Sequence, residues 1–222
     1  MALGKKELWP QGPPPPQSKR PEPQATFTPV SFALVAISVA LFLWGSFNRG
    51  IGAVGVLWGP AVAEGQWWRV FTSLVTHGGP LHLFFNLSVV WTVGRALEVV
   101  LGAARFLLVT LVTGLGSALF VLAFNFEVKT VGMSGAILGW VAVLLPIIQP
   151  AGRRQLVVWL VQVGLLSLIP GVSWAGHLGG FLTGLPLGLS LRFGRKAFAA
   201  ALPVTAFVVG ALTYLAGSGR FR

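Results

Sequence analysis

Seven apolar segments, separated by short polar stretches, most constrain how this 222-residue chain can fold. Hydrophobic residues make up 55% of the chain and charged residues only 9%, whereas a soluble domain has about 25% charged residues. A helix needs about 20 apolar residues to cross the hydrocarbon core of a bilayer. The sequence therefore predicts an all-α polytopic membrane protein. Its predicted spans are 30–47, 81–101, 106–124, 134–148, 156–169, 174–191 and 197–215.

The basic residues predict an orientation in the membrane. A net charge of +11 could indicate nucleic-acid binding, but the Lys and Arg residues occur in short clusters between apolar segments, as in cytoplasmic loops, so no nucleic-acid partner is predicted. With the N-terminus inside, the inner segments contain 11 of the 16 basic residues. The positive-inside rule therefore favours a cytoplasmic N-terminus and an outer location for the long segment 48–79.

Few residues of this chain can perform chemistry. It has no Cys and no Asp, five Glu and three His. A Ser-His-Asp triad, thiol catalysis and cysteine metal sites are therefore excluded, and neither a metal nor another cofactor is predicted. Hydrolytic chemistry would have to use Ser, His, Asn and backbone groups.

Several polar residues are predicted to lie at one depth near the outer surface. Residues 134–149 would form a helix of about 24 Å, shorter than the core of about 30 Å, so Ser134 would lie below the outer surface. His177 falls one turn into the sixth span. His82 and Asn86, four residues apart, share one face near the start of the second. The second, fourth and sixth spans run in the same direction, which brings these residues to one level.

Small residues predict that two of these spans are neighbours. Gly176, Gly180, Gly184 and Gly188 recur every four residues in the sixth span, and Gly135 and Gly139 have the same spacing in the fourth. Such faces allow transmembrane helices to approach closely. We therefore expect Ser134 and His177 near the shared outer end of the two helices.

Taken singly, these residues have ordinary interpretations. Ser134 could be a helix N-cap, His177 could bond a neighbouring carbonyl, and His82 and Asn86 could join helices by hydrogen bonds. Together they match the requirements of acyl transfer, with Ser134 as nucleophile and His177 as base. The Ser134 amide, the Asn86 amide and the His82 ring could donate to an oxyanion. Gly132 would leave room for the backbone turn beside that oxyanion.

Four motifs resemble those of rhomboid intramembrane serine proteases. The sequence GMSG at 132–135 resembles the nucleophile motif, and HGGPLHLFFN at 77–86 is similar to the pattern on the second helix. The sequence GHLGGFLTG at 176–184 resembles the catalytic-histidine helix, and WWR at 67–69 resembles a Trp-Arg motif of the first loop. The resemblance covers about residues 30–192.

The resemblance implies a site and a division of the chain. Ser134 and His177 would be catalytic, with His82, Asn86 and the Ser134 amide as the oxyanion hole. Supporting residues would be Gly132, Gly135, Gly180, Gly184, Trp68 and Arg69.

Residues 1–28 would be a disordered proline-rich cytoplasmic tail, 29–192 a rhomboid core of six transmembrane helices, and 193–222 an additional transmembrane helix with a short tail. The first loop would lie partly in the membrane, and the short fifth span would be the lateral gate. Leu138 stands where many members have Tyr against the histidine ring.

The implied function is cleavage of transmembrane protein substrates near the outer face of a lipid bilayer. The predicted location is a prokaryotic plasma membrane, with the active site open to the outer side. One alternative is an inactive rhomboid-like protein that binds or escorts membrane clients, although such proteins lack the Ser or the His. Another is a transporter, but the polar residues do not continue across the membrane and no inverted repeat of broken helices is evident.

Overall fold

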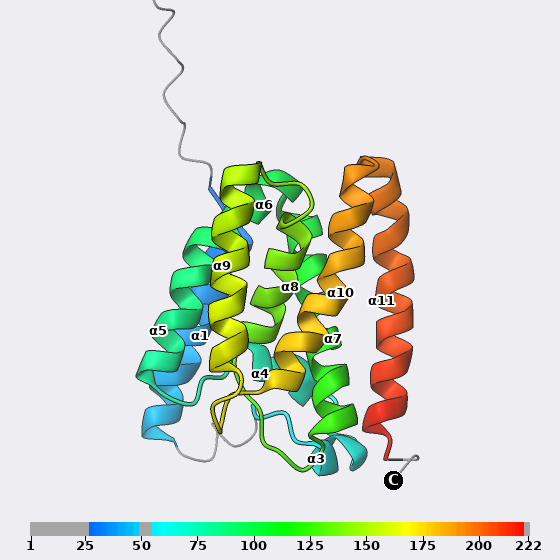
Figure 1. The fold of residues 1–222 in the computed structure, drawn as a ribbon. Helices are drawn as coiled ribbons and strands as arrows, with labels where there is room; N and C mark the ends of the chain where they lie inside the picture. The colour runs from blue at the N-terminus through cyan, green and yellow to red at the C-terminus, as the bar shows by residue number, and fades with distance from the viewer. Residues whose placement is uncertain (1–26, 49–54, 220–222) are drawn as a thin grey trace, which may run out of the picture.

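The chain folds as a bundle of helices (Figure 1). The structure, a computed structural model, describes residues 27–48 and 55–219, so most of the predicted tail lies outside the described residues. The helices are α1 (Pro29–Phe47), α3 (Gly59–Ala63), α4 (Arg69–Val75), α5 (Pro80–Val89), α6 (Arg95–Leu101), α7 (Ala103–Phe124), α8 (Ser134–Leu144), α9 (Pro150–Leu166), α10 (Trp174–Arg192) and α11 (Arg195–Gly217). A π-helical segment, Val90–Gly94, joins α5 to α6.

Four helical segments of the described chain are long and apolar enough to cross a membrane. They are Pro29–Phe47, Pro80–Leu101, Ala103–Phe124 and Arg195–Gly217, which match the first, second, third and seventh predicted spans within a few residues. The helix α8 is apolar but has only 11 residues. An all-helical membrane protein is thus confirmed, whereas the layout of six spans plus a seventh stays a prediction.

The fourth and fifth predicted spans differ from the observed helices. The helix α8 ends at Leu144 rather than at residue 148, because Pro146 has no backbone N–H and restricts the residue before it. The helix α9 begins at Pro150 rather than at residue 156, since proline suits the first turn. The predicted spans left Arg153 and Arg154 in a loop between residues 148 and 156, and this is wrong, because both lie in the first turns of α9.

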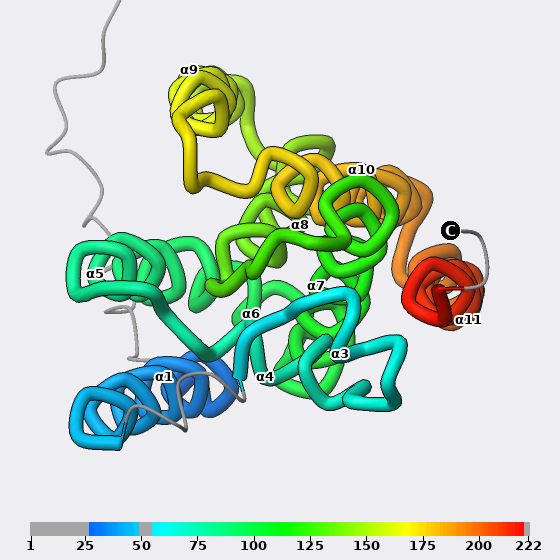
Figure 2. The backbone as a smooth tube through the Cα atoms, turned by 90° about the horizontal axis from the view of Figure 1, so that it is seen from below, coloured from blue at the N-terminus to red at the C-terminus, as the bar shows by residue number. Residues whose placement is uncertain are grey.

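The helix α8 forms the centre of the bundle. Figure 2 shows it enclosed by the other helices, with α1, α5, α9 and α11 at the periphery. Every residue from Gly135 to Leu144 is buried. A helix that is apolar on all sides can lie in a protein interior or against lipid. Because α8 has only 11 residues, it is too short to span a bilayer alone, and it is surrounded by the other helices instead. Its Trp140 packs on Phe106 of α7, with ring centroids 5.0 Å apart.

Glycines bring α8 and α10 into backbone contact. A Cβ atom added at Gly180 would collide with the carbonyl oxygen of Gly135, and one added at Gly184 would collide with that of Gly139. In the other direction, a Cβ at Gly139 would come within 2.9 Å of the Gly180 carbonyl oxygen. The predicted close approach of these two helices is confirmed.

A buried carboxylate ties α1 to α6 at the opposite end of the bundle from α3 and α4. Glu98, only 3% exposed, accepts hydrogen bonds from the backbone N–H groups of Val30 and Ser31 at 2.9 and 2.8 Å and from the Ser31 hydroxyl at 2.7 Å. These N–H groups belong to the first turn of α1, where no partner within the helix is available. The negative charge also complements the positive end of the helix dipole.

We expect Gly180→Ala to lower the free energy of unfolding by about 1–3 kcal/mol, because the new methyl group must push the α8 backbone away. Gly210→Ala is the matched control, since a Cβ at Gly210 of α11 would meet nothing within 4 Å. Unfolding in detergent micelles compares the two variants. Equal stabilities would show that this backbone contact does not limit the stability of the bundle.

We expect Glu98→Gln to lower the free energy of unfolding by about 3 kcal/mol, because hydrogen bonds to a charged acceptor are each worth about 1.5–3 kcal/mol. The amide nitrogen of Gln would also face backbone donors. The exposed Glu64, changed to Gln, is the control and should alter stability by less than about 0.5 kcal/mol. The same unfolding assay applies, and a Glu98→Gln variant as stable as the control would refute the capping role.

Candidate active site

Three helices begin at the same end of the bundle and bring polar side chains together there. The N-terminal ends of α5, α8 and α10 lie near α3 and α4, at the bottom of Figure 1. His82, Ser134 and His177 all belong to the first turns of these helices. The three helices therefore run in the same direction and bring these residues to one level of the bundle, as expected from the sequence.

Ser134 and His177 form a hydrogen-bonded pair. The Oγ atom of Ser134 lies 2.8 Å from Nε2 of His177. The His177 side chain is 8% exposed, and Ser134 is half-buried. The alternative interpretation of Ser134 as an N-cap is wrong, because Met133 occupies that position and Ser134 is the first residue of α8. The capping serine at this end is Ser173, whose hydroxyl accepts from the Gly176 N–H of α10.

The other nitrogen of the His177 ring has a partner that the sequence analysis missed. Ser167, directly after α9, has its Oγ atom 2.6 Å from His177 Nδ1. The same Oγ atom lies 2.7 Å from the carbonyl oxygen of Val163. The only sequence signal was an isolated hydroxyl in the apolar stretch LLSLIP, ten residues before the histidine.

Gly132 allows the His82 ring to lie against the backbone just before Ser134. Its φ angle is +108°, a conformation that favours glycine, and its N–H donates to the Ser73 carbonyl at 2.8 Å. A Cβ atom at this position would come within 2.5 Å of the His82 ring. The ring is therefore next to the turn that leads into Ser134.

Asn86 lies one turn after His82 and is buried, at 6% exposure. Its Nδ2 group donates one hydrogen bond to the His82 carbonyl oxygen at 2.9 Å, which leaves a second N–H on the same amide. This arrangement holds the amide against its own helix while retaining a donor.

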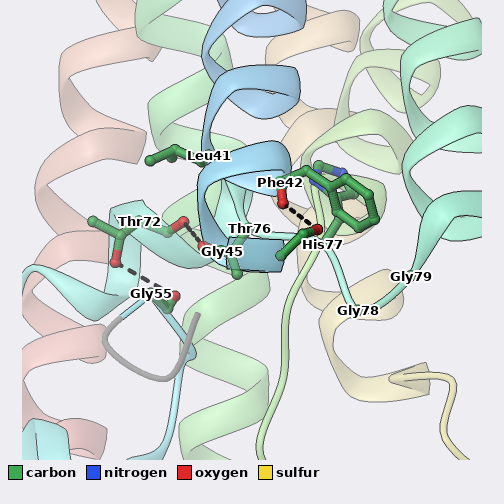
Figure 3. A pocket seen from close by; sticks show the side chains of 10 residues that line it. Leu41, Phe42, Gly45, Gly55, Thr72, Thr76, His77, Gly78 and Gly79 are labelled. Atoms are coloured by element: carbon green, nitrogen blue, oxygen red, sulfur yellow. Dashed lines mark hydrogen bonds between the residues drawn. The ribbon is translucent and has the colours of Figure 1, made fainter. Parts of the chain in front are cut away.

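His77 does not belong to the Ser134–His177 pair. Its ring centroid lies 5.3 Å from that of His82, and it lines a separate cavity of about 350 Å³ between α1 and the turn before α5 (Figure 3). Burial and the neighbouring His82 lower the pKa of His77 to about 4, so its ring is neutral at pH 7. Its proximity makes it a neighbour of the site rather than a member.

Arg69 contacts the strand-like segment that pairs with the residues before Gly132. Its Nη1 group donates to the Val56 carbonyl at 2.8 Å, and Leu57 pairs with Thr130 through backbone hydrogen bonds of 3.0 and 2.9 Å. Thr130 in turn precedes the turn at Gly132.

The Trp68 indole is 48% exposed, whereas its neighbour Trp67 stacks on Tyr214 of α11 at 5.3 Å. The described chain contains no cluster of side chains suited to a metal ion.

Comparisons with known proteins identify the family. Residues 64–194 match the model of the Rhomboid domain. The chain is 30% identical to Rhomboid protease GluP of Bacillus subtilis (strain 168), over 85% of this chain and 40% of GluP. It is 32% identical to Putative rhomboid protease YdcA of the same organism, over 69% of this chain and 86% of YdcA.

A eukaryotic relative is Rhomboid-type serine protease 2 of Emericella nidulans, which is 34% identical over 57% of this chain and 27% of that protein. The chain thus spans less than two thirds of the length of GluP and of the Emericella protein. The Rhomboid match covers more than half of the chain, and the described helices include several of membrane-spanning length. The chain therefore belongs to the rhomboid family of multi-pass integral membrane proteins.

Proposed function

We propose that this protein is an intramembrane serine endopeptidase that cleaves transmembrane-helix substrates through an acyl-enzyme formed on Ser134. The observation that most supports this is the 2.8 Å contact between Ser134 Oγ and His177 Nε2. A serine hydroxyl becomes a nucleophile when a base at this distance accepts its proton. Several relatives are named as rhomboid proteases, and one as a serine protease.

The reaction proceeds in two halves. In the first, His177 Nε2 takes the Ser134 proton while Oγ attacks the peptide carbonyl, and the protonated ring then gives this proton to the leaving amine. In the second, the ring takes a proton from water, which attacks the acyl-enzyme and releases the new carboxyl end. Ser134 regains its proton from His177, so the enzyme returns to its starting state.

The tetrahedral intermediates require hydrogen-bond donors for their oxyanion. The Ser134 backbone N–H lies at the N-terminus of α8, where the first-turn N–H groups have no partner within the helix and the dipole favours negative charge. The His82 ring beside Gly132 and the remaining N–H of Asn86 supply the other donors. Gly132 and Arg69 support this arrangement, and Gly135, Gly180 and Gly184 keep α8 and α10 in contact.

The basic residues of the folded chain support the proposed orientation. Arg95, Arg105, Arg153, Arg154, Arg192, Arg195 and Lys196 lie at or near the end of the bundle opposite Ser134. Under the positive-inside rule this end is cytoplasmic, and Ser134 lies near the outer face. The same proposal includes a cytoplasmic N-terminus and a location in a prokaryotic plasma membrane. It also includes the division of the chain into a core at 29–192 and an additional transmembrane helix with a short tail at 193–222.

Substrate would enter past α9. None of the residues Pro150–Leu166 is buried, so this helix is the least embedded of the long helices near the site. An element with few buried apolar contacts opens at low free-energy cost. The alternative of an inactive relative that escorts membrane clients is less consistent with a Ser-His pair at hydrogen-bond distance, because such a role requires no nucleophile.

We expect Ser134→Ala and His177→Ala each to lower cleavage of a transmembrane-helix substrate on the order of 10⁴-fold or more, because either change removes an essential part of the nucleophilic unit. The assay uses the full chain in proteoliposomes, and mass spectrometry locates the cut. Ser190→Ala, at the far end of α10, is the control and should retain activity. Cleavage by Ser134→Ala, or a cut at the cytoplasmic end of the substrate, would overturn the proposal.

We expect His82→Ala and Asn86→Ala each to lower kcat by about 10²–10³, the usual effect of removing one oxyanion donor. KM should change much less, because the oxyanion exists only in the transition state and the intermediates. Asn125→Ala, just after α7, is the control for loss of an amide at this end of the bundle. Variants that raise KM without lowering kcat would indicate substrate binding instead.

A further inference from the structure

Ser167 is a buried hydroxyl at the end of the peripheral helix α9, and it plays no part in the two-residue mechanism above. Its side chain is 8% exposed, whereas no residue of α9 itself is buried. Its Oγ atom has two partners at short distance, His177 Nδ1 at 2.6 Å and the Val163 carbonyl oxygen at 2.7 Å. It therefore connects the end of α9 to the ring that contacts Ser134.

The hydrogens of this chain of contacts can be assigned by counting donors. Two oxygen atoms at 2.7 Å repel each other unless a hydrogen lies between them, and a carbonyl oxygen has none to give. The Ser167 hydroxyl therefore donates to Val163. Because a hydroxyl has a single hydrogen, Ser167 can offer His177 only a lone pair, and the hydrogen between Oγ and Nδ1 must belong to the ring.

A neutral imidazole has one N–H and one bare nitrogen. With the hydrogen on Nδ1, Nε2 is bare and accepts the Ser134 hydroxyl proton across the 2.8 Å contact. In the opposite tautomer, the Ser167 hydroxyl would have to donate to the bare Nδ1. No hydrogen would then lie between Ser167 Oγ and the Val163 carbonyl oxygen, and their lone pairs would face each other. It would also place a ring hydrogen between Nε2 and Ser134, so that Nε2 could not act as the base.

We propose that Ser167 is a positioning residue that holds His177 in the tautomer with hydrogen on Nδ1, and so makes Nε2 the base for Ser134. The proposal rests on the catalytic role of Ser134 and His177 proposed above. The chain has no Asp for this place, and Leu138, one turn after Ser134, has no hydrogen-bonding group. When the ring becomes charged during the reaction, the Ser167 lone pair also accepts from the imidazolium, and such hydrogen bonds are stronger than neutral ones.

The test compares Ser167→Ala and Ser167→Thr with wild type. Threonine keeps the hydroxyl, and Thr110, Thr113 and Thr183 of this protein already bond to the carbonyl four residues back, at 2.8 Å. Ser190→Ala is again the control, because it removes a hydroxyl that donates to a backbone carbonyl on α10 without contacting His177. Unfolding in micelles shows whether each variant is folded.

We expect Ser167→Ala to lower kcat, and the rate at which a fluorophosphonate labels Ser134, by about five- to tenfold, the size of one lost hydrogen bond. KM should stay within about twofold, because no substrate contact is removed. Ser167→Thr should restore both rates to within about twofold of wild type. A Ser167→Ala variant with unchanged rates, or a loss that Ser167→Thr does not restore, would overturn the proposal.

Nitrogen-15 NMR of histidine-labelled protein measures the tautomer without any need for activity, and the chain has only three histidines. The expected spectrum shows hydrogen on His177 Nδ1 in wild type and in Ser167→Thr, and a mixture of tautomers in Ser167→Ala. Hydrogen on Nε2 in wild type would refute the assignment. An inactive wild type with the expected tautomer would instead refute the proposed protease function alone.

Discussion

The backbone contact between α8 and α10 is the constraint on which the rest of the site depends. Facing glycines remove the side chains that would hold the two helices apart, so Gly180 and Gly184 meet carbonyl oxygens of Gly135 and Gly139. Since Ser134 and His177 lie in the first turns of these helices, the same contact determines the distance between their side chains. In a membrane, where apolar surface gains little from leaving lipid, such close packing is a main source of helix association.

The depth of the site has a related cause. The helix α8 is too short to cross a bilayer alone and is buried along its length from Gly135 onward. Its N-terminus therefore lies inside the protein, where the partnerless N–H groups of the first turn face a site instead of lipid. Polar groups in such surroundings must be paired, and the contacts from Ser134 through His177 and Ser167 to Val163 form a continuous series of hydrogen bonds.

Much of this arrangement could be predicted because it follows from local patterns. Hydropathy predicted the first, second, third and seventh spans, and glycine spacing predicted that α8 and α10 are neighbours. The errors arose where local chemistry competed with hydropathy. Pro146 ended α8 early, and Pro150 started α9 before its basic residues. Ser134 as nucleophile, with His82 and Asn86 as oxyanion donors, stays a prediction that the geometry favours.

The sequence by itself determined the membrane class, the limited set of reactive residues and the pairing of the glycine faces, because each depends on residue type and spacing along one segment. Only the tertiary structure decided how Glu98 caps α1, how Gly132 accommodates His82 and how Ser167 reaches His177. These contacts join different segments of the chain. The hydrophobic periodicity of the sequence does not specify how those segments are rotated relative to one another. A side chain's hydrogen-bond partner is set by that rotation and by ångström-scale separations, which arise only when the whole bundle is packed.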